Sequence, residues 1–462
     1  MQQAWLAPFP TVRINIVVLG VTTIVLAREQ LHRGLRSIIS LEHCVNNTLV
    51  SSTVSSYYQR PPEFNREVII MKILLAQSMS YFSLGGASKA CRGLIDGLAQ
   101  RGHSCAIVMI DNREQLEAEG FKPGRSKGCF ELELGGIKMF AAESAHEQWR
   151  PMMECLRTFD PDWTLVSENG VMLLSTALEA HDPARTVVIV QSIITDLPTG
   201  ASALEDQIRT LFSRPAGIIT VSNYMREYIK RFSGLDSTVL RFPSYGPGPF
   251  THFNNFDSSY VLAVNPCAYK GISIFLSLAE KLPHVRFGAI PFWGTSAEDR
   301  AALERLPNVT MVQPSWEVDD IFRQTKVLLV PSLWGEAFGQ IVIDAMLRGI
   351  PVLASNAGGL PEAKLGVDYV LPVNMIERYE LDDKGQTQPV VPEQDVSPWL
   401  ETLSRILTDR ALYERVSLDS RKAALSFVEG LGVEPFEHYL ESLAQPKPAT
   451  QLEQLSSANF VF

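Results

Sequence analysis

Residues 327–363 read VLLVPSLWGEAFGQIVIDAMLRGIPVLASNAGGLPEA. Two apolar runs, VLLV and PVLA, have the length and composition of buried parallel strands, and the residues between them have the length of a helix. Within this largely apolar stretch stand two carboxylates, Glu336 and Asp344. If residues 339–348 are helical, the two acids lie about 12 Å apart and can hold two parts of one extended ligand. The stretch therefore predicts a strand, a helix and a second strand, with acids placed for a ligand.

Short apolar runs alternate with helical patterns along the chain from Met71 onward. The runs before residue 241 are MKILLAQ, CAIVMI, WTLVSEN, VVIVQS and GIITVSN, and those after residue 256 are YVLAVN, VRFGAI, NVTMVQ, KVLLVPS, PVLASN and YVLPV. Between the two groups, RFPSYGPGPFTHFNNF (241–256) is dense in Pro and Gly, which resist both helix and strand. The alternation predicts an α/β protein with two Rossmann-like parallel-sheet domains that face a cleft.

The composition shifts near Met71, where a Ser/Thr-rich stretch gives way to the first apolar run. From Pro398 the pattern is helical, and these helices either pack on the second domain or cross back to the first. The expected division is an accessory or poorly ordered extension (1–70), the first domain (71–245), a linker (246–257), the second domain with terminal helices (258–445) and a tail (446–462).

The composition is that of a soluble globular protein. Of 462 residues, 20% are charged and 46% are hydrophobic, which excludes a multi-span membrane protein and a disordered chain. The net charge is -10, and residues 71–462 hold 35 basic and 47 acidic groups. Such a surface repels polyphosphate, so we expect no nucleic-acid partner.

The cysteines predict a reducing compartment and no metal site. Six cysteines are scattered without a C-x-x-C pair and without His at metal-ligand spacing. We therefore expect buried thiols, no metal, no cofactor and a cytoplasmic protein. The segment 14–27 (INIVVLGVTTIVLA) is too short to span a membrane and lacks a clear cleavage site, so an accessory extension is favoured over an anchor, and peripheral membrane contact stays open.

Four loops follow predicted strands, where ligands bind in open α/β sheets. Residues 83–87 (SLGGA) and 355–362 (SNAGGLPE) carry glycine pairs that allow close backbone approach, or simply form tight turns. Residues 265–271 (NPCAYKG) present Lys270 to a diphosphate, or begin a solvated helix. Residues 331–339 present Glu336 at a helix start, where it can accept bonds from sugar hydroxyls or act as a helix-terminal charge, while Asp344 can hold the two hydroxyls of a ribose or lie on an exposed face.

Two other kinds of site are disfavoured. Asp160 and Asp162 match the D-x-D pattern of some metal-dependent transferases, but they precede the strand WTLV and so lie at the wrong end of it. A Ser-His-Asp hydrolase is disfavoured because no G-x-S-x-G elbow occurs.

Taken together, these motifs resemble the retaining, nucleotide-sugar-dependent glycosyltransferases of family 4, which have the GT-B fold. The resemblance covers Met71 to about Ala444 and is most specific over residues 327–363, which are similar to the family's E-x7-E signature. MKILLAQ, GGAS and LAQRGH resemble the family's opening, and ITVSNYMREYI (219–229) and LPNVTMV (306–312) also have equivalents.

The resemblance assigns roles to particular residues. It implies that Glu336 contacts the transferred sugar, that backbone N–H groups around Phe338 and Gly339 hold sugar and phosphate, and that Asp344 binds ribose. It also implies that Lys270 and Gly86 face the diphosphate. Gly358 and Gly359 belong to the same donor side. The first domain is then the acceptor side, and the second binds the nucleotide sugar.

This chain departs from the family pattern at three places. Asp344 replaces the usual second Glu and is one methylene shorter, and Asn265 replaces the usual Arg five residues before the Lys. Gln191 and Ser192 stand on the acceptor side, where many members have a His.

Two functions follow as hypotheses. The first is metal-independent transfer of a sugar, with retention, from a nucleotide-sugar donor to an unknown acceptor. The alternative is a GT-B-like binding or scaffold protein that has lost catalysis, which the three departures motivate.

Overall fold

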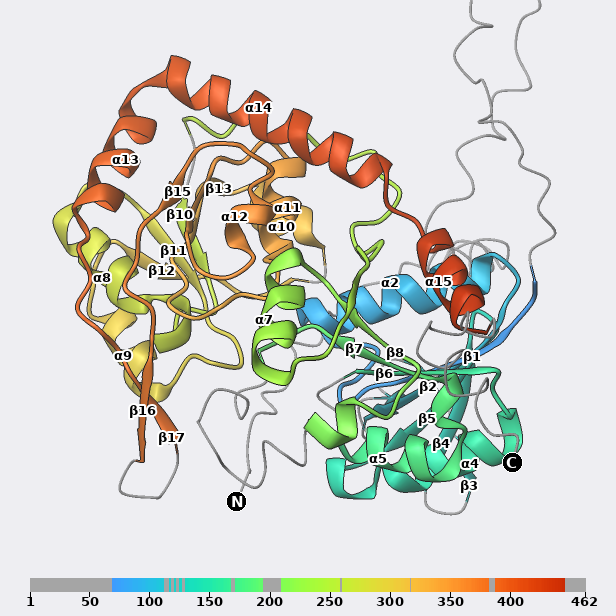
Figure 1. The fold of residues 1–462 in the computed structure, drawn as a ribbon. Helices are drawn as coiled ribbons and strands as arrows, with labels where there is room; N and C mark the ends of the chain where they lie inside the picture. Colours follow the sequence, from blue (N-terminus) through green and yellow to red (C-terminus); the bar gives the residue numbers. More distant parts are fainter. Residues whose placement is uncertain are drawn as a thin grey trace, which may run out of the picture. The chain divides into compact units, whose positions relative to one another are not determined.

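The short apolar runs form parallel strands of two sheets in the computed structural model of the protein (Figure 1). The structure describes residues 69–111, 116–117, 120–121, 124–126, 129–167, 171–193, 209–257, 260–315, 317–381 and 387–444. All of these belong to one unit, Val68–Phe462. The predictions for the apolar segment 14–27, for residues 1–68 of the extension and for the tail lie outside the described residues.

The first domain is built on a sheet of nine described strands in the order β3-β4-β5-β2-β1-β6-β7-β8-β9. The strands are β1 (Lys72–Ala76), β2 (Ser104–Ile110), β3 (Gly124–Ser126), β4 (Cys129–Leu134), β5 (Ile137–Ala142), β6 (Trp163–Ser167), β7 (Thr186–Val190), β8 (Gly217–Thr220) and β9 (Thr238–Val239). The strands from β5 to β9 are parallel, whereas β3, β4 and β5 pair antiparallel at one edge. The parallel part confirms the predicted sheet, and the antiparallel edge is an addition that we did not predict.

Helices cover both faces of this first sheet. They are α2 (Gly86–Gln100), α4 (Trp149–Phe159), α5 (Val171–Ala180) and α7 (Asn223–Ser233), with short 3₁₀ turns η1 (Ala145–Glu147) and η3 (Pro183–Arg185). Figure 1 shows α4 and α5 on one side of the sheet and α2 on the other. Because helices cover both faces, β6 and β7 are buried at every position, and most of their residues are apolar.

The second domain has a sheet of six described strands in the order β12-β11-β10-β13-β14-β15, all parallel. The strands are β10 (Tyr260–Val264), β11 (Phe287–Ile290), β12 (Val309–Met311), β13 (Thr325–Val330), β14 (Val352–Ser355) and β15 (Val370–Leu371). The helices between them are η4 (Ala268–Lys270), α8 (Ile272–Lys281), α9 (Ala297–Glu304), α10 (Val318–Phe322), α11 (Gln340–Leu347) and α12 (Leu360–Ala363). This sheet confirms the prediction of a second parallel sheet.

Two features complete the second half of the chain. An antiparallel hairpin, β16 (Arg378–Leu381) with β17 (Thr387–Val390), follows β15 and was not predicted. The helices α13 (Ser397–Thr408), α14 (Arg410–Glu429) and α15 (Glu434–Ala444) then end the described chain. In Figure 1, α14 runs along the second domain and leads to α15 beside the first.

The last helix, α15, crosses back to the first domain. Its Glu437 accepts hydrogen bonds from Arg101 Nε (2.6 Å) and pairs with His103 Nε2 (2.8 Å). A Cβ on Gly217 of β8 would lie 2.1 Å from the Tyr439 hydroxyl oxygen, so this helix packs closely on the first sheet. Both placements expected for the terminal helices therefore occur: α14 packs on the second domain, and α15 crosses back to the first.

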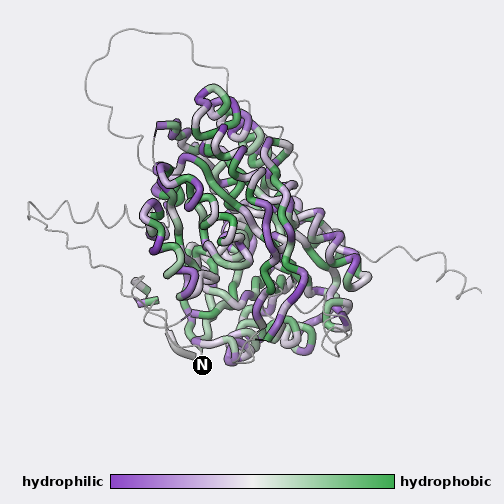
Figure 2. The backbone as a smooth tube through the Cα atoms, turned by 90° about the vertical axis from the view of Figure 1, so that its left-hand side faces the viewer, coloured by the Kyte–Doolittle hydropathy of each residue, from purple (hydrophilic) through white to green (hydrophobic). Residues whose placement is uncertain are grey.

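Hydrophobic and hydrophilic segments alternate along the chain, as Figure 2 shows. The described cysteines Cys91, Cys105, Cys129, Cys155 and Cys267 are all buried free thiols, as the sequence predicted for them. Among the described residues, no helix combines the length and the apolar character that crossing a membrane requires.

Candidate active site

Lys270 and Glu336 meet at the carboxyl ends of two neighbouring parallel strands. Lys270 ends the 3₁₀ turn after β10, and Glu336 lies in the loop between β13 and α11. Because β10 and β13 are paired, their following loops lie side by side, and Lys270 Nζ donates a hydrogen bond to Glu336 Oε1. Ser332 Oγ (2.6 Å) and Trp334 Nε1 (3.2 Å) donate to the same oxygen. The structure therefore forms a cation–carboxylate pair from the two residues on which the sequence placed the chemistry.

The pair keeps Glu336 ionised. Burial acts to raise the pKa of Glu336, but the Lys270 ammonium and the three hydrogen bonds outweigh burial and hold the pKa below its ordinary value. All three donors reach Oε1, so Oε2 has no hydrogen-bond partner among the described residues. Glu336 therefore offers an anionic oxygen that can accept hydrogen bonds from hydroxyl groups.

Two helix N-termini approach each other next to this pair. Helix α11 begins after Gly339 (φ 98°) and α2 begins after Gly85, and neither has a side-chain cap or an acidic residue in its first turn. A Cβ on Gly86 would lie 3.9 Å from the side-chain amide of Gln340, so the two helix starts face one another. The backbone N–H groups of Phe338 and Gly339 have no hydrogen-bond partner in the described structure. Uncapped helix starts attract anions, so this is a favourable place for a phosphate.

Gly358 and Gly359 pack against protein backbone. A Cβ on Gly358 would lie 2.3 Å from the backbone nitrogen of Glu336, and one on Gly359 would lie 2.6 Å from the carbonyl oxygen of Ala337. The N–H of Gly359 donates to the carbonyl of Glu336 (2.6 Å). The close backbone approach that the glycine pair predicted is thus an approach to the loop that carries Glu336, which these glycines hold in place.

Asp344 lies in a contact between the two domains. Its carboxylate is buried and is held through both oxygens by Lys89 Nζ of α2, at 3.1 and 2.8 Å. Arg348, one turn further along α11, lies 3.7 Å from the same carboxylate. Asp344 is therefore a paired interdomain acid in this structure, and a ribose would have to compete with Lys89 for it.

Asn265 has an unusual backbone and an unsatisfied amide. It adopts a positive φ of 57° directly after β10, and its Oδ1 accepts a hydrogen bond from Gly294 N (2.9 Å). That bond fixes the amide orientation, and Nδ2 is then buried without a hydrogen-bond partner among the described residues. A buried donor of this kind lacks an acceptor, which a bound ligand can supply.

Residues 294–365, which include the Glu336 loop and helix α11, match the family model described as "Glycosyl transferases group 1". The chain carries a group 1 glycosyltransferase region. A D-inositol 3-phosphate glycosyltransferase from Corynebacterium efficiens is 28% identical over 115 residues, which is 25% of this chain and 23% of the relative. The chain thus spans about a quarter or less of the length of the first curated relatives that it matches.

Solved structures show the fold over most of the chain. A sucrose-phosphate synthase from Thermosynechococcus elongatus has a TM-score of 0.57 at 14% identity, over 84% of this chain and 100% of the other. The Anabaena protein HepE, in complex with UDP and glucose, has a TM-score of 0.57 at 15% identity, over 81% of this chain and 100% of the other. These likenesses, together with the two facing parallel sheets, confirm the predicted GT-B fold.

The first domain makes contacts with the group 1 region that the sequence did not reveal. Glu362 of α12 accepts hydrogen bonds from Asn223 Nδ2 (2.6 Å) and from Arg241, and Ser222 Oγ donates to the carbonyl of Ala337 (2.5 Å). These contacts bring the start of α7 against the Glu336 loop and Arg241 against α12. Lys89, three residues after Gly86, is the missed residue with a sequence signal, since it lies one helical turn along the same face.

Gln191 and Ser192, which the resemblance placed on the acceptor side, directly follow β7. Gln191 is buried and donates from Nε2 to Cys91 Sγ of α2 (3.0 Å). The neighbouring Ile193 lies against the Glu336 loop, since a Cβ on Gly335 would be 2.5 Å from its Cδ1. Ile193 therefore packs against the loop of Glu336.

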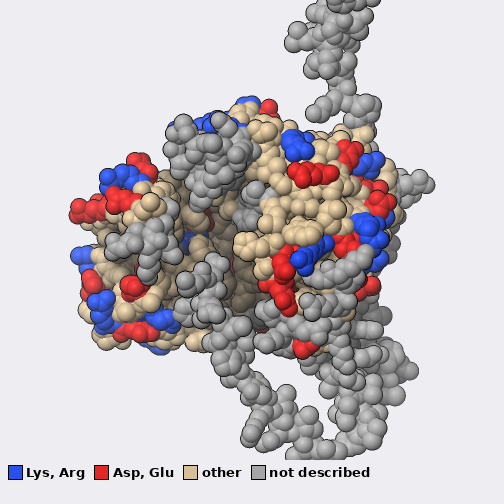
Figure 3. All heavy atoms as spheres, turned by 90° about the horizontal axis from the view of Figure 1, so that it is seen from below, with Lys and Arg blue, Asp and Glu red and all other residues tan. Residues whose placement is uncertain are grey.

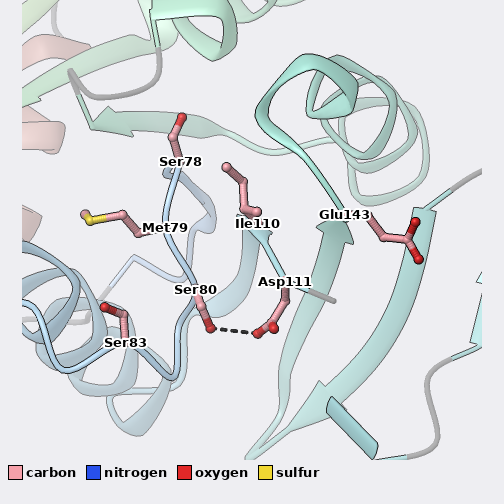
Figure 4. Close-up of a pocket in the computed structure, with 7 residues that line it drawn as sticks. All are labelled: Ser78, Met79, Ser80, Ser83, Ile110, Asp111 and Glu143. Carbon is pink, nitrogen blue, oxygen red and sulfur yellow. Dashed lines mark hydrogen bonds between the residues drawn. The ribbon is translucent and has the colours of Figure 1, made fainter. Parts of the chain in front are cut away.

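Figure 3 shows the surface hollowed near the middle of its view, between the two domains. On the first domain, a pocket of about 410 Å³ opens at the carboxyl ends of β1, β2 and β5 (Figure 4). It is lined by Ser78, Met79, Ser80, Ser83, Ile110, Asp111 and Glu143. Ser80 Oγ donates to Asp111 Oδ2 at 2.6 Å. Hydroxyl and carboxylate groups thus line the end of the first sheet that leads to Gly86.

Asp160 and Asp162 lie before β6, as the sequence predicted. Asp162 Oδ2 accepts a hydrogen bond from the backbone nitrogen of Lys72 (2.8 Å), and Asp160 ends α4. Both acids therefore stabilise a junction between a helix and the opposite end of the sheet from the candidate site.

Proposed function

We propose that this protein transfers a sugar from a nucleotide-sugar donor to an acceptor. The observation that supports this proposal best is the Lys270–Glu336 pair beside two uncapped helix N-termini. Such a site combines positive charge for a diphosphate with an anionic acceptor for sugar hydroxyls. The group 1 match over residues 294–365 and the relatives named glycosyltransferases support the same activity.

The arrangement suggests how the donor is held. The Lys270 ammonium and the N–H groups of Phe338 and Gly339 lie where they can take the diphosphate, and Glu336 Oε2 can accept from the transferred sugar. Asn265 Nδ2 adds one neutral donor. As the bond to the sugar breaks, negative charge grows on the leaving nucleotide diphosphate, and fixed donors stabilise it without reorganising.

We propose that the reaction retains the anomeric configuration and needs no metal. In this mechanism the acceptor attacks from the side that the diphosphate leaves, and Lys270 with the two helix N-termini supplies the positive charge. The pocket at the ends of β1, β2 and β5 is the proposed acceptor side. Activity that survives EDTA, and a product whose anomeric configuration by NMR equals that of the donor, are the expected results. Loss of activity in EDTA that a divalent cation restores, or an inverted product, contradicts this part.

UDP-sugars are the first donors to test, because HepE is a structural neighbour in complex with UDP and glucose. The experiment is a screen of UDP-, GDP- and ADP-sugars against a cell extract, with products detected by mass spectrometry. We expect one donor class to give a glycosylated product and free nucleotide, and Glu336→Gln to give neither. If Glu336→Gln transfers sugar at the wild-type rate, the assignment is wrong.

A second candidate function is a GT-B-like binding or scaffold protein. The observation that favours it is the Lys89–Asp344 contact, which occupies the acid proposed for the ribose. Calorimetry separates the two functions, since an enzyme binds a donor and releases nucleotide when acceptor is added. A scaffold that has lost the donor site binds no nucleotide sugar in the panel.

A further inference from the structure

Four aromatic side chains form a row at the carboxyl edge of the second sheet. They are Trp293 after β11, Trp334 after β13, Tyr269 after β10 and Tyr379 in β16. Successive ring centroids lie 6.3 Å (Trp293 to Trp334), 5.1 Å (Trp334 to Tyr269) and 6.5 Å (Tyr269 to Tyr379) apart. Four separate segments of chain therefore contribute to one aromatic row.

The row is joined to the candidate active site through Trp334. Its Nε1 donates to Glu336 Oε1 (3.2 Å), and the Lys270 ammonium lies 5.2 Å from its ring centroid. The orientation of this indole is therefore fixed by the two residues that we propose to hold the donor. The neighbouring rings extend outward from the point where the transferred sugar would lie.

The two ends of the row are open to solvent. Trp293 is 63% exposed and Tyr379 is 42% exposed, and Leu381, two residues further along β16 and so on the same face of the strand, is 72% exposed. Large exposed apolar side chains that adjoin one another, rather than standing singly, mark interaction surfaces. No hydrogen bond of the Trp293 indole occurs in the described structure, so its contact with Trp334 is what positions this ring.

We propose that this aromatic row, with Trp293 at one end and Tyr379 at the other, is a saccharide-binding subsite for the outer rings of an oligosaccharide acceptor or product, whose reacting end enters from the first-domain side. A pyranose ring has an apolar C–H face and a rim of hydroxyls, so its face packs on an indole or phenol ring while its hydroxyls stay in water or reach a carboxylate. A ligand of repeating rings fits a row of rings, whereas a single nucleobase covers one of them. This inference deepens the proposed function by naming the class of acceptor, but binding at the row does not require transfer.

The test is a titration of the full chain with maltopentaose, cellopentaose and chitopentaose, followed by intrinsic tryptophan fluorescence and calorimetry without any donor. We expect at least one pentaose to bind, and Trp293→Ala to weaken that binding at least ten-fold, which equals about 1.4 kcal/mol. Tyr379→Ala should weaken it about three-fold. The matched control is Trp149→Ala, which removes a 46% exposed indole from α4 of the first domain and should leave the affinity unchanged.

Three results overturn the inference. They are the absence of binding by any of the three pentaoses up to about 10 mM, equal affinities of wild type and Trp293→Ala, and a loss of UDP affinity in Trp293→Ala with unchanged saccharide affinity. The last result would mean that the ring stacks on the nucleobase of the donor.

Because Trp293 is exposed, its variant should unfold at the wild-type temperature. The two proposals fail separately: pentaose binding without any donor binding sinks the proposed function, and transfer without pentaose binding sinks the subsite.

Discussion

Replacing Lys270 by Met should destabilise the second domain through the acid that it leaves behind. The side chains of Lys270 and Glu336 are 22% and 12% exposed, so the pair is largely buried. Removing one partner of a buried ion pair leaves an uncompensated charge and costs roughly 3–5 kcal/mol. Ser332 and Trp334 still donate to Glu336 Oε1, so we expect the lower end, about 3 kcal/mol. For a domain of this size that loss lowers Tm by about 6–12 °C.

The double variant Lys270→Met with Glu336→Gln separates the loss of stability from the loss of catalysis. Glu336→Gln keeps the shape and removes the charge, so the double variant should recover at least half of the lost Tm while remaining inactive. The assay is thermal unfolding at pH 7 by calorimetry for wild type, both single variants and the double variant. Because the pKa of Glu336 is lowered in the fold, this stabilisation is present above the ordinary carboxyl range and is lost as the pH falls through the lowered pKa. Strictly additive shifts in Tm would show that the two side chains do not interact.

Three further changes test other parts of the structure. Gly358→Ala should lower the free energy of unfolding by about 3 kcal/mol and abolish transfer, because φ is 62° and the Cβ would meet the backbone of Glu336. Its control is Gly366→Ala (φ 79°, no described atom within 4 Å of the Cβ), which should lower it by about 1 kcal/mol. A similar Tm for both variants contradicts the role of Gly358 in packing. Burial lowers the pKa of Lys364 to about 7, so between pH 7 and 10 the unfolded chain binds a proton that the folded chain does not. The free energy of unfolding of the wild type should therefore rise with pH by up to about 1.4 kcal/mol per pH unit more than that of Lys364→Met. Parallel pH profiles of the two proteins would contradict a neutral buried Lys364. Lys89→Met should bind the nucleotide about five-fold more tightly, because Asp344 is released for the ribose. It should also turn over more slowly, because the interdomain contact is lost. An unchanged Kd and kcat would show that the Lys89–Asp344 pair affects neither donor binding nor turnover.

The strands were predictable because buried parallel strands are continuous apolar runs. VLLV and PVLA became β13 and β14, and every other run that we identified became a strand. Strand β4, CFELEL, lies next to the edge strand β3, and it is partly exposed with apolar and acidic residues that alternate in sequence. The hairpin strand β16, RYEL, is exposed throughout. Neither strand is a continuous apolar run, which is the signal on which the prediction relied.

The proximity of Lys270 and Glu336 followed from topology, since loops after parallel strands gather at one edge of a sheet. The pairing of Asp344 with Lys89 did not, because it depends on how the two domains approach each other. The left-handed backbone of Asn265 was equally invisible, because nothing in NPCAYKG demands a positive φ at a non-glycine residue. The glycine pair 358–359 predicted a close approach but not its partner, which is the backbone of the Glu336 loop.

The most direct test of the account is the affinity difference between a nucleotide sugar and its free nucleoside diphosphate, measured by calorimetry with the donor found in the screen. If Glu336 accepts hydrogen bonds from the transferred sugar, the wild type should bind the nucleotide sugar more tightly by about 1.5–3 kcal/mol. Glu336→Gln should lose most of that difference while its affinity for the diphosphate stays within about two-fold. An equal difference in both proteins, or no binding of nucleotide by the wild type, would show that Glu336 and Lys270 do not form a nucleotide-sugar site.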